Sequence, residues 1–133
     1  MVKTIAVMGS TGSIGRQTLD VVKANPEKVK IAALAANTND ELLEQQIIAF
    51  NPDIAAVYDV EAAKRLRNRY RGKTEILSGE EGLRTVATYS NIDTVVAAVS
   101  GYAGLRSTLA AVKHKKDIAL ANKETLVVAG ELV

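Results

Sequence analysis

The sequence contains no cysteine and a single histidine, His114. Without cysteine, the 133 residues cannot form a disulfide framework, a thiolate zinc site or a cysteine nucleophile. A single histidine likewise excludes a metal site that needs several imidazole ligands. Disulfide-stapled folds, cysteine-dependent enzymes and histidine-cluster metal sites are therefore excluded for these residues.

The chain also lacks a strong charge imbalance and long apolar runs. Its 17 lysines and arginines nearly balance 15 aspartates and glutamates, so the charge indicates neither a nucleic-acid partner nor a membrane partner. No apolar run approaches the ~20 residues of a membrane span. The first expected strand begins almost at Met1, so we expect no signal or transit segment before the fold, and we expect a cytoplasmic protein.

The length and composition that remain are those of one ordinary globular domain. The chain has 133 residues, of which 47% are hydrophobic and 24% charged. Apolar runs of strand length occur at residues 5–8, 29–36, 54–57, 74–77, 93–99 and 118–121. Segments with helical periodicity lie between and after them, at residues 14–24, 40–50, 60–70, 79–87, 105–116 and 123–132. This alternation predicts an α/β fold of the Rossmann type, a doubly wound and mostly parallel sheet with helices on both faces.

Short signals predict where several helices begin and end. Asn25-Pro26 and Asn51-Pro52 should stop the first two helices, because the residue before proline is pushed out of the α region. Asp59 is expected to cap the third helix. Ser78, followed by Glu81 three residues later, is a capping-box signature for the fourth.

Three glycines lie where the first expected strand is followed by the first helix. Gly9, Gly12 and Gly15 have the spacing G-x-x-G-x-x-G, a variant of the G-x-G-x-x-G of the commonest dinucleotide sites. Gly9 permits a tight turn, Gly12 allows a ligand to approach the backbone, and Gly15 allows the helix to pack on the strand. The free amides of the first helical turn would attract an anion such as a pyrophosphate. The pattern favours a nucleotide site; the alternative is a plain strand–helix turn that needs glycine for packing.

The loop after the second expected strand bears on the choice of cofactor. In NAD sites an acidic residue at this tip accepts hydrogen bonds from the ribose hydroxyls. Here the tip carries Asn37, Thr38 and Asn39, and the acids Asp40 and Glu41 follow only in the first turn of the next helix. Amide and hydroxyl donors without a carboxylate favour the 2′-phosphate of NADP. Alternatively, Asn37 turns the chain and Asn39 caps the helix, and both roles can hold together.

Basic residues gather around the end of the third expected helix. They are Lys64, Arg65, Arg67, Arg69, Arg71 and Lys73. The favoured interpretation is a solvated face whose cations suit a helix C-terminus. A phosphate or nucleic-acid site is the alternative, although the residues surround the helix and are not interleaved with aromatics.

Three stretches together resemble the 1-deoxy-D-xylulose 5-phosphate reductoisomerase family. They are the glycine turn from Gly9 to Gly15, the Ala-Ala-x-x-Asn that ends at Asn39, and Leu120-Ala121-Asn122-Lys123-Glu124. The last is far more specific than the glycine turn, and the likeness extends along the whole chain in order. The resemblance implies an NADPH-dependent, homodimeric enzyme of the non-mevalonate isoprenoid pathway. Such an enzyme converts 1-deoxyxylulose 5-phosphate to 2-C-methylerythritol 4-phosphate with Mg²⁺ or Mn²⁺.

The resemblance also implies roles for individual residues. Gly9, Thr11, Gly12, Ser13 and Ile14 would bind the pyrophosphate side of NADPH, and Asn37, Thr38 and Asn39 its 2′-phosphate side. Asn122 and Glu124 would contact NADPH, and Lys123 would bind the phosphorylated sugar substrate. Family members often carry a basic or serine residue between glycine and asparagine where this chain has Asn37-Thr38-Asn39, so a basic residue is missing here.

The family's metal ligands and flexible loop belong to a catalytic domain that follows the matched region, so residues 1–133 are expected to form only the NADPH-binding domain. No catalytic residue and no metal ligand is therefore expected within the chain.

Two alternative functions remain: another NAD(P)-dependent oxidoreductase, such as a dihydrodipicolinate reductase or a semialdehyde dehydrogenase, and a nucleotide-sensing module without enzymatic activity. The Asn122-Lys123-Glu124 motif argues against the second.

Overall fold

The computed structural model describes residues 2–98, 117–121 and 126–128. Its strands are β1 (Lys3–Met8), β2 (Val29–Ala36), β3 (Ile54–Val57), β4 (Glu75–Ser78), β5 (Thr94–Ala97), β6 (Asp117–Ala121) and β7 (Leu126–Val128). Its described helices are α1 (Ser13–Ala24), α2 (Asp40–Phe50), α3 (Val60–Arg69) and α4 (Gly79–Ala87). These bounds agree with the sequence-based prediction to within one or two residues for β1 to β4 and for α1 to α4.

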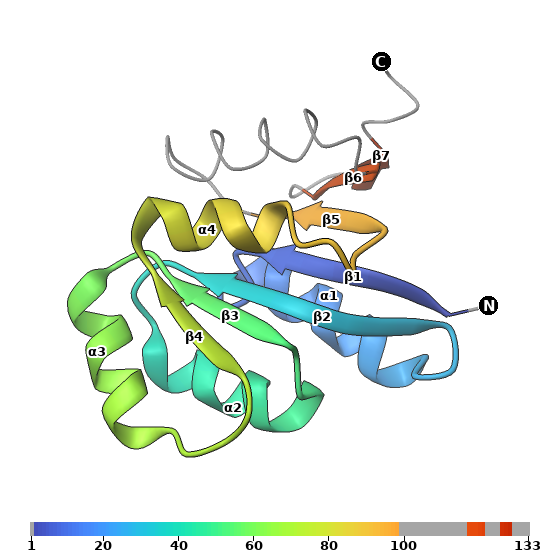
Figure 1. Cartoon of the computed structure of the whole chain (residues 1–133). Helices are drawn as coiled ribbons and strands as arrows, with labels where there is room; N and C mark the ends of the chain where they lie inside the picture. The colour runs from blue at the N-terminus through green and yellow to red at the C-terminus, as the bar shows by residue number, and fades with distance from the viewer. Residues whose placement is uncertain (1, 99–116, 122–125, 129–133) are drawn as a thin grey trace.

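The strands form one sheet in the order β4-β3-β2-β1-β5-β6-β7 (Figure 1). All neighbouring pairs are parallel except β6 and β7, which run antiparallel. The chain moves outward from β1 to β4 on one side and then crosses back to β5 on the other side of β1. This order confirms the doubly wound fold, and it places the point where the strand order reverses between β1 and β5. Ligands of such sheets bind beyond the carboxyl ends of the strands at that point.

Helices cover both faces of the sheet, as predicted (Figure 1). On one face, α1, α2 and α3 bury Leu19, Ile47 and Leu66 against one set of strand side chains. On the other face, α4 buries Leu83 and Val86 against the alternate set. The central strands are buried on both faces, and for that reason they read in the sequence as nearly continuous apolar runs.

The expected helix at residues 123–132 is wrong for Leu126–Val128. These residues form β7, and Val127 pairs with Leu120 at the end of the sheet. The pairing gives the backbone of Val127 and Val128 a ladder in the extended state that β-branched residues favour. The expected helix at residues 105–116, and the last part of the apolar run at residues 93–99, lie outside the described residues.

The predicted capping box at Ser78 is also wrong in its hydrogen bonding. Ser78 does occupy the N-cap position of α4, but its side chain accepts no hydrogen bond from the helix. Gly79 follows in a left-handed conformation with φ of 73°. The Ser78 hydroxyl instead lies 3.5 Å from a guanidinium nitrogen of Arg67.

No described helix of the protein has the length and apolarity that a bilayer crossing would require.

Candidate functional site

The glycine turn joins β1 to α1 at the carboxyl end of the sheet. The backbone N–H groups of Gly9 and Ser10 both donate to the carbonyl oxygen of Ala35 in β2, at 2.8 and 3.0 Å. Gly9 has a φ of 84°, in the left-handed region where a side chain is strained. The first glycine is therefore required by the turn itself, which is held against the neighbouring strand.

Gly15 and Gly12 serve different purposes. A Cβ atom at Gly15 would lie 2.0 Å from the carbonyl oxygen of Gly9, so α1 can approach the turn only without a side chain there. A Cβ atom at Gly12 would lie 3.6 Å from the same oxygen, which is ordinary contact. Gly12 has φ −78° and ψ 173°, a conformation that any residue adopts. The described part of the chain therefore needs glycine at position 15, but places no such demand at position 12.

The N-terminus of α1 presents free backbone donors beside Gly12. The N–H of Arg16 donates to the carbonyl oxygen of Gly12 at 2.9 Å and begins the helical pattern. The amides of Ser13, Ile14 and Gly15 precede it, in the first turn, where a helix provides no intrahelical partner. This turn has no acidic residue, and Ser13 is exposed. The arrangement suits an anion, which the amides and the helix dipole would stabilise.

A buried glutamine holds the turn from the side of α2. The Nε2 of Gln46 donates to the carbonyl oxygen of Ser10 at 2.9 Å, and Gln46 is only 7% exposed. The planar peptide between Ser10 and Thr11 therefore directs its N–H away from Gln46. Two further buried oxygens, Ser10 Oγ and Gln46 Oε1, have no hydrogen-bond partner in the described structure. Gln46 thus fixes the orientation of the Thr11 amide.

The sequence reasoning missed Gln46, although a signal was present. Leu43 and Ile47 lie on the buried face of α2, and Gln46 is a polar residue on that same face. A polar side chain in an apolar stripe needs a partner, because burying it without one is costly. That partner is the backbone of the glycine turn.

The loop after β2 confirms the capping role expected for Asn39. The Oδ1 of Asn39 accepts a hydrogen bond from the Leu42 N–H at 3.1 Å and caps α2. The carbonyl oxygen of Asn37 accepts from the Asp59 N–H at 2.9 Å. All three loop residues are exposed, and the side chains of Asn37 and Thr38 have no partner among the described residues. These two side chains are therefore available to a ligand.

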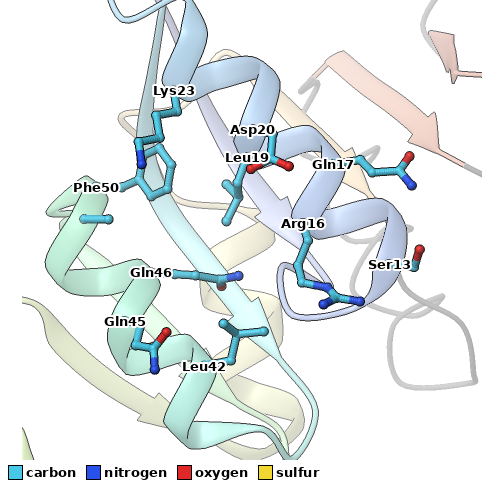
Figure 2. A pocket seen from close by; sticks show the side chains of 11 residues that line it. Ser13, Arg16, Gln17, Leu19, Asp20, Lys23, Leu42, Gln45, Gln46 and Phe50 are labelled. Atoms are coloured by element: carbon cyan, nitrogen blue, oxygen red, sulfur yellow. The ribbon is translucent and has the colours of Figure 1, made fainter.

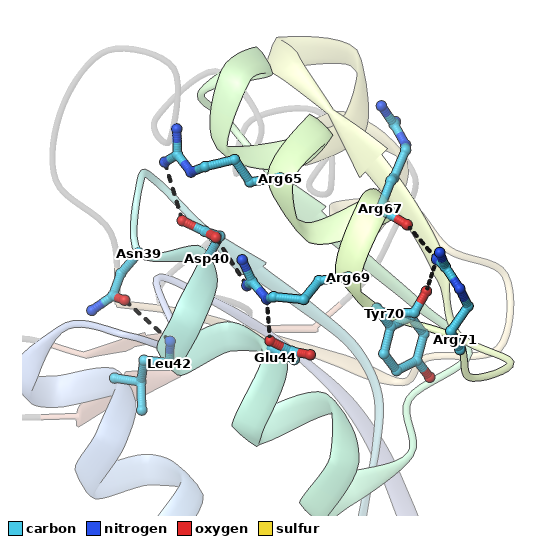
Figure 3. Close-up of polar contacts among 9 residues, drawn as sticks. All are labelled: Asn39, Asp40, Leu42, Glu44, Arg65, Arg67, Arg69, Tyr70 and Arg71. Atoms are coloured by element: carbon cyan, nitrogen blue, oxygen red, sulfur yellow. Dashed lines mark hydrogen bonds and ion pairs between the residues drawn. The ribbon is translucent and has the colours of Figure 1, made fainter.

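Asp40, which follows the loop, is the centre of an ion-pair cluster between α2 and α3 (Figure 3). Its carboxylate lies 3.1 Å from Arg65 and 2.9 Å from Arg69, and Arg69 also lies 2.7 Å from Glu44. Burial by itself would raise the pKa of Asp40, but the hydrogen bonds from Arg69 and Arg65 bring that pKa below its ordinary value. The carboxylate is thus ionised and forms ion pairs with two arginines, which hold α3 against α2.

Two further arginines, Arg67 in α3 and Arg71 just after it, donate to carbonyl oxygens of the protein. Arg67 donates to the carbonyl oxygen of Ile76 at 3.1 and 3.0 Å. Arg71 donates to the carbonyl oxygen of Arg67 at 3.3 Å, in the last turn of the helix. The interpretation of these cations as suited to a helix C-terminus is confirmed at Arg71. The remaining hydrogen bonds were not predicted, because they depend on how α3 packs against β4.

A groove of about 550 Å³ runs between α1 and α2 (Figure 2). Its apolar floor includes Leu19, Leu42 and Phe50. Its polar lining comes from both helices and comprises Ser13, Arg16, Gln17, Asp20, Lys23, Gln45 and Gln46. The groove begins at the first turns of both helices, and so next to the glycine turn and the loop after β2.

Three of the predicted site residues, Asn122, Lys123 and Glu124, lie outside the described residues. The strand before them, β6, runs parallel to β5 and β1, so its carboxyl end lies at the same edge of the sheet as the glycine turn. Among the described residues, no three histidine, aspartate or glutamate side chains are grouped so that they could hold a metal ion. The described site is therefore the glycine turn together with the loop of residues 37–39.

Comparison with known families identifies one match that spans nearly the whole chain. The family described as 1-deoxy-D-xylulose 5-phosphate reductoisomerase matches residues 5–130. A protein of that name from Ruminiclostridium cellulolyticum is 52% identical over the full chain, and one from Bacillus thuringiensis is 54% identical over the full chain. This chain covers 35% and 34% of those two proteins, so it spans about a third of their length.

Solved structures show the same relationship. The Zymomonas mobilis reductoisomerase in complex with NADPH is similar to this chain with a TM-score of 0.85 and 36% identity. The match covers 93% of this chain and 33% of the Zymomonas chain. A reductoisomerase in complex with magnesium matches with a TM-score of 0.82 and 37% identity. That match covers 93% of this chain and 32% of the other chain. Fold and sequence thus agree over the same third of the relatives.

Proposed function

The chain belongs to the 1-deoxy-D-xylulose 5-phosphate reductoisomerase family, and from this premise we propose that it forms the NADPH-binding domain of such an enzyme. The whole enzyme would convert 1-deoxyxylulose 5-phosphate to 2-C-methylerythritol 4-phosphate in isoprenoid synthesis. It would act in the cytoplasm as a homodimer with Mg²⁺ or Mn²⁺. The family match does not favour a different oxidoreductase or a nucleotide-sensing module.

The observation that carries this proposal is the difference between Gly12 and Gly15. The protein's own packing explains Gly15, but a side chain at Gly12 would meet only open space and the oxygen of Gly9 at 3.6 Å. Glycine at position 12 is explained when a ligand passes close to the backbone there. The free amides of the first turn of α1 indicate that this ligand is an anion, as the pyrophosphate of NADPH is.

For the remaining site residues we propose the roles that the family resemblance implies. Thr11, Ser13 and Ile14 would line the pyrophosphate beside Gly9 and Gly12. Asn37, Thr38 and the free amide group of Asn39 would face the 2′-phosphate. Asn122 and Glu124 would contact NADPH, and Lys123 would bind the phosphate or carbonyl of the sugar as a point charge.

The chemistry would be divided between this domain and the part of the relatives that the chain does not match. NADPH would supply the hydride, and a divalent ion would polarise the reacting oxygens of the sugar. The described residues offer no metal-ion cluster, so we propose that the metal ligands lie in the unmatched two thirds. The task of these 133 residues would then be to hold and orient the cofactor.

The test of the pyrophosphate site is Gly12→Val, with Gly12→Ala as a graded control. Both residues adopt the backbone conformation of Gly12, so the far-UV spectrum and the melting temperature should stay close to those of the unaltered chain. NADPH affinity, followed by fluorescence titration, should fall modestly for alanine and be abolished for valine. Unchanged titration of the valine variant would refute the site.

A second experiment tests whether these residues bind the cofactor without catalysing the reaction. We expect the purified chain to bind NADPH weakly, independently of Mg²⁺, and to turn over nothing. Absorbance of the reduced nicotinamide is followed after NADPH, 1-deoxyxylulose 5-phosphate and Mg²⁺ are added together. Substrate-dependent oxidation by the 133 residues alone would show that the reaction does not need the part of the relatives that the chain does not match.

A further inference from the structure

Arg16 is a cation in the first turn of α1 without a partner in the described part of the chain. Its side chain is exposed and lines the groove between α1 and α2. Figure 2 shows the Arg16 side chain extending from α1 on the side that faces α2, with Leu42 across the groove. Asp20, one turn further along α1, lines the same groove but forms no ion pair with it.

The arginines of α3 provide the contrast. Arg65 and Arg69 are bound to Asp40 and Glu44, and Arg67 donates to the carbonyl oxygen of Ile76. Each of these cations has a structural task that accounts for its presence. Arg16 has none, so the packing of the described residues does not explain why an arginine stands at this position.

The position of Arg16 relates it to both halves of the described site. Its own N–H donates to the carbonyl oxygen of Gly12, so the residue directly adjoins the glycine turn. Across the groove, Leu42 is tied by its N–H to the side chain of Asn39 in the loop after β2. Arg16 thus adjoins the glycine turn and shares the groove with Leu42, the residue that Asn39 of the loop caps.

We propose that Arg16 binds the 2′-phosphate of NADPH and determines the preference for NADPH over NADH. This inference rests on the proposed function, in which Asn37 and Thr38 face the 2′-phosphate. These two side chains carry no charge and cannot neutralise a phosphate. Arg16 supplies the missing positive charge from the neighbouring helix, so it is not found by inspecting the loop alone.

The chemistry of the guanidinium suits this role. Arginine is always charged and offers several N–H donors in a planar fork that matches the oxygens of a phosphate. The α2 residues that line the groove are Leu42, Gln45, Gln46, Ala49 and Phe50, so no carboxylate of α2 faces the guanidinium from that wall. An exposed charge of this kind also makes binding sensitive to ionic strength.

The test compares Arg16→Gln with Lys23→Gln, which removes the same charge at the far end of the same groove. The purified chain is titrated with NADPH and NADH, and then with adenosine 2′,5′-bisphosphate and adenosine 5′-phosphate. Arg16→Gln should weaken NADPH and the bisphosphate at least about tenfold and leave NADH and the monophosphate unchanged. Arg16→Lys should restore part of the loss, and Lys23→Gln should change nothing.

Arg65→Gln is included as the rival, because Arg65 lies beside Asp40 at the other end of the loop. If Arg65→Gln removes the preference for NADPH and Arg16→Gln does not, the assignment to Arg16 is wrong. Equal weakening of NADPH and NADH by Arg16→Gln would also overturn it, since the residue would then act on the pyrophosphate or the fold. If the unaltered chain binds neither cofactor, the proposed function fails first and this inference fails with it.

Discussion

Two neighbouring regions at the carboxyl end of the sheet use arginine and polar groups in opposite ways. In the α2–α3 cluster, Asp40, Glu44, Arg65 and Arg69 satisfy one another, and the result is a fixed contact between two helices. In the turn between β1 and α1, the first-turn amides and Arg16 have no described partner. Groups that are satisfied within the protein stabilise it, whereas groups held in place without partners are available to a ligand.

The glycines divide in the same manner. Gly15 is closed in by the Gly9 oxygen, and Gly12 is open. Gly15 thus serves the packing of the protein, as the α2–α3 cluster does, although it lies in the turn that we assign to the cofactor. The comparison between structural and ligand-binding groups can therefore be tested one residue at a time.

The largest effect is expected for Gly15→Ala. Its Cβ would lie 2.0 Å from a backbone oxygen that cannot move without breaking the turn. We expect a loss of about 3 kcal/mol or more in the free energy of unfolding. Urea denaturation measures it, with Gly12→Ala as the matched control; Gly12 is the N-cap of α1, so this control should lose no more than about 1 kcal/mol. Similar midpoints for the two variants would remove the distinction between the glycines.

The next effect is expected for Gln46→Leu. The change leaves the buried carbonyl oxygen of Ser10 without its donor, at a cost of about 1–3 kcal/mol. It also releases the Ser10–Thr11 peptide, so NADPH affinity should fall in a variant that is still fully folded. Gln45→Leu, at the exposed neighbour on the same helix, is the control for both measurements. If affinity is retained while stability falls, Gln46 holds the fold but does not orient the turn.

A third effect concerns cofactor choice. Asn37→Asp places a carboxylate at the tip of β2, where it should repel the 2′-phosphate and accept the ribose hydroxyls. We expect the order of affinities to reverse in favour of NADH, by about tenfold, which corresponds to 1.4 kcal/mol. Thr38→Ala, which adds no charge, should weaken NADPH without favouring NADH. Equal affinities of the unaltered chain for both cofactors would show that the loop does not read the phosphate.

The smallest effect is expected for Asp40→Asn, which breaks the cluster. Arg65 and Arg69 are 56% and 40% exposed, so solvent screens both pairs and the loss should be about 1 kcal/mol at neutral pH. The pKa of Asp40 is lowered in the folded state, so the unfolded chain takes up the proton first as the pH falls. The stabilisation is thus fully present above the ordinary pKa of about 3.9 and is lost only as the pH falls further.

Denaturation of the unaltered chain and Asp40→Asn from pH 7 to pH 3 measures this dependence. The difference between them should be constant down to about pH 5 and should shrink only in more acid solution. A difference that already disappears near pH 6 would mean that Asp40 is not the titrating group. NADPH affinity at neutral pH should be almost unaffected, because the cluster serves the helices.

The sequence by itself determined the fold class and the position of the glycine turn. Alternating apolar runs and helical patterns have different periods, and a doubly wound sheet follows from their order. Local chemistry also sufficed for Asn39 and Asp59, since an N-cap bonds to a backbone N–H only three residues away. The choice between a site and a plain turn remained open, because a glycine pattern does not say which glycine the packing needs.

The tertiary structure decided what depends on distant residues. It shows that packing requires Gly15 but not Gly12, and that Gln46 bonds to Ser10, 36 positions away in the sequence. It also shows that Leu126–Val128 form an edge strand where a helix was expected. It also distinguished Arg65 and Arg69, which are bound by α2, from Arg16, which is not. Charge and hydrogen-bond partners come from neighbours in space, so the same residue type can be structural on α3 and available to a ligand on α1.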